Sequence, residues 1–451
     1  MTDVSTRIPE LAAMIDHWSL VDALKGGTRS MRDAGKSYLP AFPHEDEDSY
    51  ANRLKAATLL PAYAETVQQM AGRVFAKPLQ LGQDVPDAIR KLFADIDREG
   101  RNLHVFARDV FEAALDYGVS YVLVDYSRVG DAQTGADMLS AGARPYCVHI
   151  RPRHVLGWKL YRQRLVQFRY IESVVEDDGE FGTKSVEQVR VIEPRRQRIF
   201  RIDKRGSWTL FDEVITSLEV VPVIPVYTNR TIQMLGSPPL MELAYLNVKH
   251  WQSQSDQDKS VRFARVRMIY ASGLESDTKL TAAADSIIPL PQDAEIKVVQ
   301  GSAESVAVGQ DALTAMEDQM KIAGAKLLTR SVLSMSDIQA GDEKAREISR
   351  LAAMAEELED ALDQVLQLMA NWIGAGEGGS VRIGADLNGA ALNGSIKLNG
   401  SIKPDDIYKA VAAGLLSKQS AYERLTLLGV ALDDVDWETE QARIGDQLPV
   451  M

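Results

Sequence analysis

The chain has 451 residues and a formal net charge of -13, with 45% hydrophobic and 25% charged residues. This composition is typical of a globular protein with several substructures and excludes a low-complexity or fibrous chain. The acidic balance argues against broad, sequence-independent binding of DNA, which needs basic surface to displace counterions, but it allows DNA to pass through the protein without adhering.

The N-terminal part of the chain is predicted to be helical. Apolar residues recur at three- and four-residue spacing in residues 8–24, 50–75 and 107–117. Stretches rich in Pro, Gly and acidic residues separate these segments. After Gly118 the sequence SYVLVDY, rich in Val and Tyr, predicts a short buried strand.

Residues 145–228 show the alternating, β-branched and aromatic pattern of a sheet, interrupted by the predicted turns DDGEFGTKS and DKRGS. The region is rich in arginine, and two interpretations stay open. The arginines lie on a solvated sheet face, or they contact an acidic neighbouring subunit. They are Arg190, Arg195, Arg196, Arg198 and Arg201.

A long helix is predicted from residue 237, with Ser237 as its N-cap and Pro238 as its first helical residue. Its first half carries an apolar stripe, whereas the following QSQSDQDKS is polar on every face. A helix of this kind either leaves the body of the protein or packs in a wet assembly. The stripe consists of Leu240, Leu243, Ala244, Val248 and Trp251.

A small α/β insertion follows this helix, with strand-like segments at VRMIYASGL and AEIKVVQG. At roughly 35 residues, the insertion is too short to fold without partners. The sequence DALTAMEDQMKIAGAKLL then predicts a second helix. Its apolar stripe consists of Leu313, Met316, Met320, Ala323 and Leu327.

A polar segment, SVLSMSDIQAG, separates this second helix from the strongest helical pattern of the chain, which ends at NWI. At ~1.5 Å per residue, that last helix would be roughly 45 Å long. Beyond it, the hexapeptide LNGSIK occurs twice in tandem, and its Asn-Gly pairs predict tight turns. Two helical segments follow, the second with Ser417 as a predicted N-cap. The stripe of the long helix consists of Leu351, Met354, Leu358, Leu362, Val365, Met369 and Trp372.

Cysteine, histidine and hydropathy patterns exclude several classes of site. The single cysteine, Cys147, cannot form an intrachain disulfide or a cysteine-based zinc cluster, and it fits a reducing cytosol. The closest histidines, His149 and His154, lie among arginines that would repel a cation, so we expect both to be structural, with no metal and no cofactor. No secretory signal is recognisable at the N-terminus, and no apolar run approaches the ~20 residues that span a bilayer.

Two features resemble functional motifs without meeting their requirements. The segment SMRDAGKS ends like a phosphate-binding loop, but Ser30 stands where that loop needs glycine, and no strand precedes it. A helix-terminating turn is the better interpretation. The acidic clusters at 45–48 and 176–178 are interpreted as solvated loop charge, with an adventitious or structural divalent ion as the alternative. No pocket that would separate two carboxyl pKa values is indicated.

The order of these elements, more than any one motif, resembles that of the portal proteins of tailed phages over nearly the whole chain. Within that family the N-terminal half resembles a branch with a YLP turn, an acidic loop, and then a tyrosine and an arginine that open the next helix. In this sequence these are Tyr38 to Pro40, the cluster at 45–48, Tyr50 and Arg53, followed by GRVFAKP at 72–78.

The resemblance implies an α+β fold divided as portal subunits are. N-terminal helices and a sheet would form the wing, and two stem helices would flank a small clip. A tunnel loop would precede a long wing helix, and a mostly helical crown would end the chain. The ranges are 1–236 for the wing, 237–266 and 304–330 for the stem helices, 267–303 for the clip, 331–346 for the tunnel loop, 347–376 for the long helix and 377–451 for the crown.

The resemblance also implies a mechanical, non-enzymatic role. Portals are homo-oligomeric rings, usually dodecamers, at one capsid vertex of the virion, and they are assembled in the host cytoplasm. The implied partners are copies of the chain, double-stranded DNA without sequence preference, the terminase large subunit, capsid and scaffold proteins and the head–tail adaptor, with no membrane. The implied channel residues are Ser331, Ser334, Ser336, Gln339, Lys344 and Arg346, and the implied docking residues of the clip are Glu275, Asp277, Lys279 and Asp293.

Two other functions stay open. A phage nuclease or NTPase could use the acidic loops or the GKS segment, and it would then hydrolyse ATP or nucleic acid as a purified chain. A head–tail adaptor is another ring-forming virion protein, although adaptors are generally much shorter than 451 residues.

Overall fold

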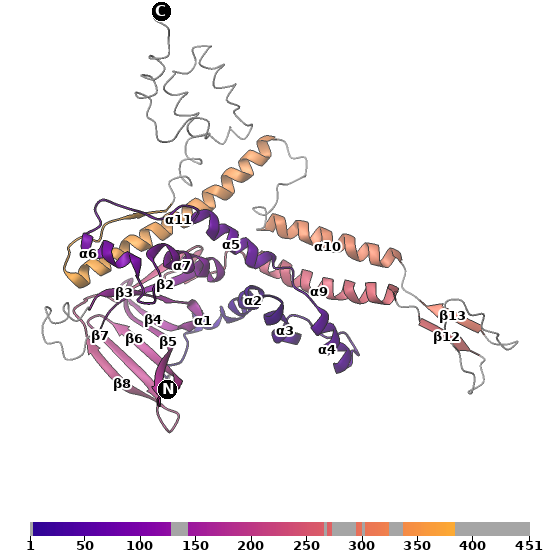
Figure 1. Cartoon of the computed structure of the whole chain (residues 1–451), viewed down its shortest axis with the longest axis horizontal. Helices are drawn as coiled ribbons and strands as arrows, with labels where there is room; N and C mark the ends of the chain where they lie inside the picture. Colours follow the sequence, from indigo (N-terminus) through magenta and orange to yellow (C-terminus); the bar gives the residue numbers. More distant parts are fainter. Residues whose placement is uncertain are drawn as a thin grey trace, which may run out of the picture. The chain divides into compact units, whose positions relative to one another are not determined.

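The computed structural model describes residues 3–127, 143–265, 268–272, 295–299, 303–323 and 337–383 (Figure 1). The chain divides into two compact units, one of residues 1–334 and 351–384 and the other of residues 335–350 and 385–451. Helices and antiparallel sheets occupy separate stretches of the sequence, so the expected α+β class is confirmed. None of the helices in the described ranges is long and apolar enough to cross a membrane.

Short helices occupy the N-terminal region, as predicted. The stretch 50–75 forms two of them, because Pro61 lacks a backbone donor and disfavours helical geometry in the residue before it. Helix α4 ends at Ala56, and α5 begins at Ala62, directly after Pro61. The helices are α1 (Pro9–Ala12), α2 (Ile15–Lys25), α3 (Gly27–Ala34), α4 (Glu47–Ala56), α5 (Ala62–Val74), α6 (Asp87–Arg90) and α7 (Leu103–Tyr117).

A three-stranded antiparallel sheet follows α7, with β2 (Val119–Tyr126) between β3 (Pro145–Ile150) and β9 (Val223–Tyr227). The predicted burial of β2 is confirmed along nearly its whole length. Gly118 joins α7 to β2 at a φ of 82°, and a Cβ there would lie 2.3 Å from the carbonyl oxygen of Ser237. Only glycine combines this backbone conformation with such a close approach.

A five-stranded antiparallel meander packs beside this sheet. Its strands run in sequence order and are β4 (Val155–Tyr161), β5 (Arg164–Asp178), β6 (Gly182–Glu193), β7 (Arg196–Ile202) and β8 (Trp208–Ile215). Strand β5 extends through Asp178, so the acidic cluster at 176–178 belongs to a hairpin strand. The prediction that it lies in a loop was wrong.

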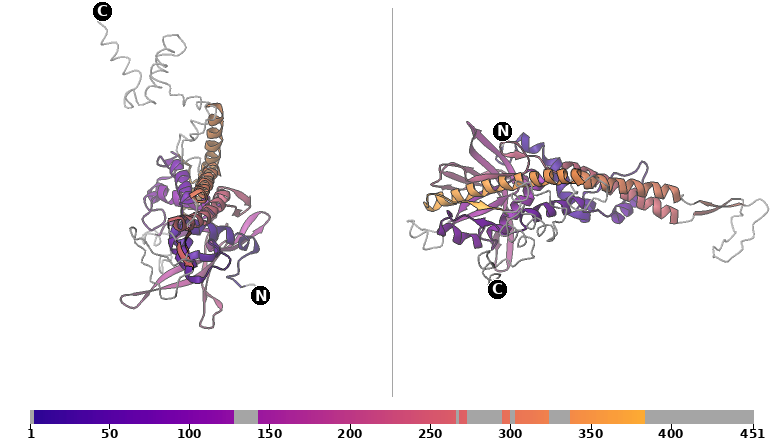
Figure 2. Two further views of the ribbon diagram at one scale, coloured as in Figure 1. Left: turned by 90° about the vertical axis from the view of Figure 1, so that its right-hand side faces the viewer. Right: turned by 90° about the horizontal axis from the view of Figure 1, so that it is seen from above.

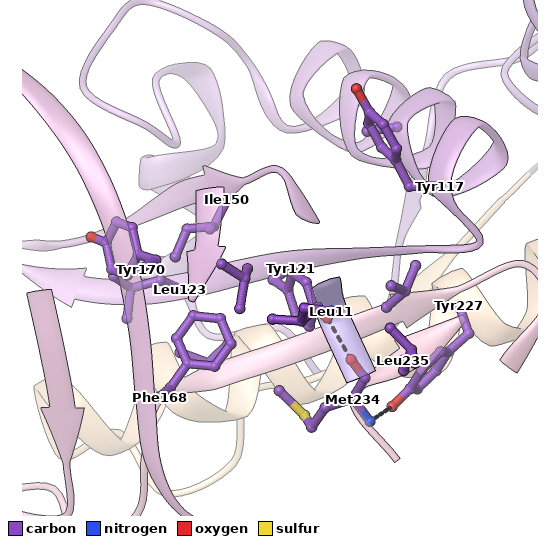
Figure 3. Packing of buried hydrophobic residues seen from close by; sticks show 14 of the residues in the cluster. Leu11, Tyr117, Tyr121, Leu123, Ile150, Phe168, Tyr170, Tyr227, Met234 and Leu235 are labelled. Carbon is purple, nitrogen blue, oxygen red and sulfur yellow. Dashed lines mark hydrogen bonds between the residues drawn. The ribbon is translucent and has the colours of Figure 1, made fainter. Parts of the chain in front are cut away.

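A hydrophobic core cluster joins residues of the two sheets and of helices α1, α2 and α7 (Figure 3). Tyr121 of β2 and Phe168 of β5 lie with their ring centroids 5.4 Å apart. The Tyr121 hydroxyl donates to the carbonyl oxygen of Met234 over 2.5 Å, and the backbone N–H of Met234 donates to the Tyr227 hydroxyl over 2.8 Å. Two buried tyrosines thus satisfy the backbone of the small β10–β11 hairpin (Arg230–Ile232 and Leu235–Gly236).

Three long helices occupy the second half of the chain: α9 (Met241–Arg265), α10 (Ala303–Ala323) and α11 (Asp337–Ile373). Between α9 and α10, strand β12 (Met268–Ser272) pairs with β13 (Glu295–Val299) in antiparallel register. Strand β14 (Val381–Arg382) pairs with the short β1 (Gln80–Leu81). Helix α11 begins at Asp337 rather than at 347, so the segment 337–346 is helical.

The start of α9 corrects one prediction. Ser237 does not cap the helix, because α9 begins only at Met241; the Ser237 hydroxyl instead accepts a hydrogen bond from the Asn229 side-chain amide over 3.1 Å. Pro238 is not the first helical residue, since it precedes Pro239 and a residue before proline is disfavoured in helical geometry. Helical hydrogen bonding starts at the Leu240 carbonyl, which accepts from the Ala244 N–H over 3.0 Å.

Candidate functional site on helices α9 and α10

Helices α9 and α10 lie side by side and form the helical hairpin (Figures 1 and 2). The predicted stripe of α10 is confirmed at Leu313, Met316 and Met320, which are buried. On α9, the predicted stripe is buried at Leu240, Leu243, Ala244 and Trp251, while Val248 is half-buried.

Polar contacts fix the register of the two helices. The Gln257 side-chain amide donates to the Val306 carbonyl over 2.7 Å. His250 Nε2 lies 3.5 Å from a carboxylate oxygen of Glu317. Gln257 lies against Gly309, where a Cβ would be 1.9 Å from its amide oxygen. The polar half of α9 is therefore partly engaged within the chain through its amide side chains.

Asn247 ties α9 to the N-terminal helices. It is fully buried; its side-chain oxygen accepts from the Tyr63 N–H over 3.0 Å, and its amide donates to the Leu60 carbonyl over 2.9 Å. Tyr63 lies in the first turn of α5, where backbone N–H groups have no partner within the helix. Sequence reasoning missed Asn247, because a single polar residue on an apolar helix face gives no signal of the backbone groups it will meet.

A second tie, the Arg53 cluster, consists of Pro40, Phe42, Glu45, Tyr50 and Arg53, packed against Lys259 of α9. The Arg53 guanidinium donates to both carboxylate oxygens of Glu45, over 2.7 and 2.9 Å, and to the Pro40 carbonyl over 2.7 Å. It also lies 4.1 Å from the centre of the Phe42 ring, and the Lys259 ammonium lies 4.5 Å from the same ring. Phe42 is thus held between two cations.

Charge and burial set the ionisation of the acidic side chains in and around this cluster. The side chains of Arg53 and Glu45 are only 7% and 3% exposed. The hydrogen bond from Arg53 lowers the pKa of Glu45, which also accepts from the Phe42 N–H over 3.0 Å. Burial raises the pKa of Asp256, which faces the same cations from α9. The cluster therefore holds a carboxylate–guanidinium pair at the point where residues 38–53 meet α9.

The structure brings together the residues on which the family resemblance rests. The Tyr38 carbonyl accepts from the Gln252 side chain of α9 over 3.0 Å, next to Pro40 and Arg53. The interpretation of 45–48 as solvated loop charge was wrong for Glu45, which is enclosed. Asp46 is exposed, as expected, and it also caps α4 by accepting from the Ser49 N–H over 2.8 Å. The GKS segment is a helix-terminating turn as predicted, since α3 ends before Gly35 at a φ of 53°.

Glutamates and aspartates of the same chain pair with the arginines of the sheet. The solvated-face interpretation is wrong for Arg190, whose side chain is largely buried, but holds for Arg195, whose side chain is 64% exposed. The contact with a neighbouring subunit stays a prediction. Arg190 donates to Asp125 over 2.7 Å and is almost wholly buried, while Arg201 donates to Glu176 over 2.6 Å. Arg190 of β6 thus reaches a carboxylate of β2 in the neighbouring sheet, and Arg201 of β7 reaches across β6 to β5. The remaining pairs are Arg195–Glu219, Arg196–Glu213 and Arg198–Glu193.

The two histidines singled out in the sequence lie apart from the hairpin. His149 Nε2 lies 2.8 Å from the Ser120 hydroxyl, and burial together with Arg151 lowers its pKa to about 3. It is therefore neutral at pH 7. Burial also lowers the pKa of His154. Across the described ranges, no three His, Cys, Asp or Glu side chains are close enough to hold a metal ion.

Several expected site residues lie outside the described residues. These are Ser331, Ser334 and Ser336 of the expected tunnel loop, Glu275, Asp277, Lys279 and Asp293 of the expected clip, and the LNGSIK repeat with Ser417. The backbone of Gln339, Lys344 and Arg346 is helical within α11, and their side chains are outside the description.

Comparison with known proteins gives two findings. A family model described as a domain of unknown function (DUF4055) matches residues 239–373, which run from α9 to the end of α11. No curated protein matches the chain.

Solved structures of gene transfer agent (GTA) particles show partial similarity. A chain from the neck of an empty GTA particle, computed with C6 symmetry, aligns at a TM-score of 0.44 and 13% identity, over 82% of this chain and 90% of that one. A chain from the virion of a native GTA particle aligns at 0.43 and 13%, over 88% and 98%. A chain from the native neck, computed with C12 symmetry, aligns at 0.39 and 12%, over 82% and 90%. Similarity at this level does not assign the chain to a family.

Proposed function

We propose that this chain is a subunit of a portal, a ring at one vertex of a phage or phage-like particle through which double-stranded DNA passes. The helical hairpin carries the proposal. Two long helices lie side by side, and the chain between them contributes the β12–β13 strand pair. In the proposed assembly, α9 and α10 are the stem, the segment that contains β12 and β13 is the clip, and α11 is the long wing helix.

The buried contacts between α9 and the N-terminal helices support this assignment. Asn247 and the Arg53 cluster join α9 to the N-terminal helices by buried hydrogen bonds and one enclosed ion pair. A stem that transmits force between a motor and a capsid needs such fixed joints, because an interface of exposed pairs contributes little and yields easily. The arginine-rich sheet is internally neutralised, which suits a wing that packs in a virion without binding DNA.

The charge of the chain fits a conduit. A net charge of -13 disfavours tight contact with phosphates, whose release of counterions otherwise drives binding to basic surfaces. Passing DNA would then meet few attractive sites outside a narrow constriction. We place that constriction at residues 331–346. There, serines and Gln339 would make weak contacts with the DNA, and Lys344 and Arg346 would reach its phosphate backbone.

The remaining partners follow from the same proposal. The clip residues Glu275, Asp277, Lys279 and Asp293 would dock the terminase large subunit during packaging and the head–tail adaptor afterwards. Capsid and scaffold proteins would contact the wing, and residues 377–451 would form the crown. We propose a dodecamer, assembled in the host cytoplasm and retained in the virion.

The rival nuclease or NTPase finds little support in the acidic clusters. Glu45 uses both oxygens on Arg53, and Glu176 lies between Arg201 and Lys184, at 2.6 and 3.7 Å. A metal-dependent hydrolase needs carboxylate oxygens that are free to bind a cation. We propose that the chain is not an enzyme, and ATP or DNA hydrolysis by the purified chain would contradict this.

Electron microscopy of the purified chain tests the proposal. We expect rings with an axial opening of at least about 20 Å, a width that admits a duplex whose major groove alone is ~12 Å wide. Assembly in the presence of scaffold protein is the second condition to examine, since some rings form only on a template. A compact monomer under both conditions would contradict the proposal.

A further inference from the structure

Helix α10 carries a second, largely apolar stripe on a face separate from its contact with α9. The outer stripe consists of Val308, Ala312, Ala315, Gln319 and Ile322, which are spaced alternately by four and three residues and of which Gln319 alone is polar. All five side chains are exposed, and Val308 and Ile322 are 68% and 63% exposed. Spacing of this kind is typical of a helix face that packs against another helix.

The inner stripe of α10 already satisfies its contact with α9. Leu313, Met316 and Met320 are buried there, and the outer stripe lies roughly a third of a turn away at 100° per residue. A helix with two separate apolar faces is typically packed between two neighbours. Within the described residues, α10 has only one of them.

Helix α9 offers a complementary face. Tyr245, Lys249 and Phe263 lie on one side of α9 by their spacing, and all three are exposed. The hydrogen bond from Gln257 to Val306 and the approach of His250 to Glu317 fix which residues lie at the same height along the hairpin. By that register Ile322 is level with Tyr245, and Asp318 is level with Lys249.

We infer that the outer stripe of α10 docks against the Tyr245–Lys249–Phe263 face of α9 in a second copy of this chain. The inference rests on the proposed ring, in which rotational symmetry places neighbouring hairpins at equal height when the hairpins run along the axis. Ile322 then meets the apolar Tyr245, and the Asp318 carboxylate meets the Lys249 ammonium. Each copy uses two different faces, so the contact is head-to-tail, and the rotational symmetry of the proposed ring closes it.

Acidic residues along the edge of the stripe favour this occupant over a membrane or nucleic acid. Glu304, Asp311 and Asp318 recur every seven residues beside the outer stripe. Carboxylates in this position repel phosphates and anionic lipids, and they match lysines on a partner helix. A second copy supplies such a lysine at the same height.

The experiment compares the mass of assemblies formed by the full chain and its variants. Val308→Asp with Ile322→Asp should raise the concentration at which rings dissociate at least tenfold, measured by mass photometry. The matched control, Val175→Asp, changes a 67% exposed side chain on β5 and should leave rings intact. Below the concentration at which rings form, thermal unfolding of both variants should match the wild type, because each altered side chain is exposed within one chain.

Charge exchange tests the pairing itself. Asp318→Lys and Lys249→Asp should each weaken rings, and the double exchange should restore a substantial part of the loss. Cysteines introduced by Ile322→Cys and Tyr245→Cys should form disulfides between copies and give a ladder of covalent multimers. The natural Cys147 is buried and does not compete.

The outcomes separate the two proposals. If the wild type forms rings, the Val308→Asp, Ile322→Asp variant forms equally stable rings, and the cysteine variant gives no covalent multimers, then this interface is wrong and the proposed ring stands. A wild-type chain that stays monomeric at every concentration would overturn both.

Discussion

In the five-stranded sheet, charged side chains find their partners within the chain, whereas in the helical hairpin apolar side chains are left exposed. Arg190, the most enclosed arginine of the sheet, meets Asp125 at 2.7 Å. On α10, Val308 and Ile322 meet no comparable neighbour in the described residues. The difference indicates that the ion pairs of the sheet are made within one subunit, and under the proposed interface the outer stripe of the hairpin is covered by another copy.

Two consequences follow from this comparison. The stability of the sheet should not depend on protein concentration, since its ion pairs and core belong to one chain. The hairpin should be more stable in the assembly, because a contact made only by the folded oligomer stabilises it by mass action. Variants in the body of the chain and at its joint with the hairpin test whether contacts within one chain and contacts between copies contribute separately to stability.

The largest effect is expected for Arg190→Met. It leaves the Asp125 carboxylate enclosed without its cation and should lower the free energy of unfolding by about 3–5 kcal/mol in urea titrations. The exposed pair Arg195–Glu219 supplies the matched control, and Arg195→Met should cost at most about 1 kcal/mol. Equal losses in the two variants would show that enclosure of the pair does not matter.

A smaller, pH-dependent effect is expected at Asp116 of α7. Burial, opposed by Lys25 at 3.0 Å, raises the pKa of Asp116 from 3.8 to about 6. Because the folded state holds this proton more tightly than the unfolded state, stability should be lost as the pH rises from about 4 to 6. The loss is at most about 3 kcal/mol relative to Asp116→Asn.

Asp116→Asn should show no such step in urea titrations between pH 4 and 7. The variant also gives up the attraction of Lys25, so the slope with pH, rather than the absolute stability, is the diagnostic. Parallel pH profiles for variant and wild type would contradict the assigned role of burial.

The smallest of the three effects is expected for Arg53→Ala at the joint between the N-terminal residues and α9. Glu45 loses both hydrogen bonds from the guanidinium, and we expect a loss of about 2 kcal/mol, since the pair is enclosed but near the surface. Lys55→Ala, on the same helix and exposed, is the control. If the joint positions the hairpin, Arg53→Ala should also weaken rings, which Lys55→Ala should not.

Much of the fold could be predicted from periodicity. The buried strand after Gly118, the inner stripe of α10 and the buried stripe of α11 at Leu351, Leu358 and Met369 follow from apolar spacing alone. Trp372 is half-buried and donates its indole N–H to the Val124 carbonyl over 3.3 Å. Such patterns show which face of a helix or strand is buried, because this depends only on the spacing of apolar residues within that element.

The partners of polar residues could not be predicted in the same way. The sequence predicted Glu45 and Glu176 to be charged residues of solvated loops, because no local pattern indicates that Arg53 and Arg201 are their partners. Asn247 accepts from a backbone N–H of the distant helix α5, and the Ser237 hydroxyl accepts from the Asn229 side chain. Pairing across the fold depends on tertiary geometry, which hydropathy does not encode.

Hydrogen–deuterium exchange of the full chain, above and below the concentration at which rings dissociate, tests the contrast between hairpin and sheet most directly. We predict that backbone amides of residues 304–323 exchange more slowly in the assembled state, while those of residues 164–202 exchange equally in both states. Equal exchange of α10 in the two states, or slowing confined to the sheet, would contradict the account.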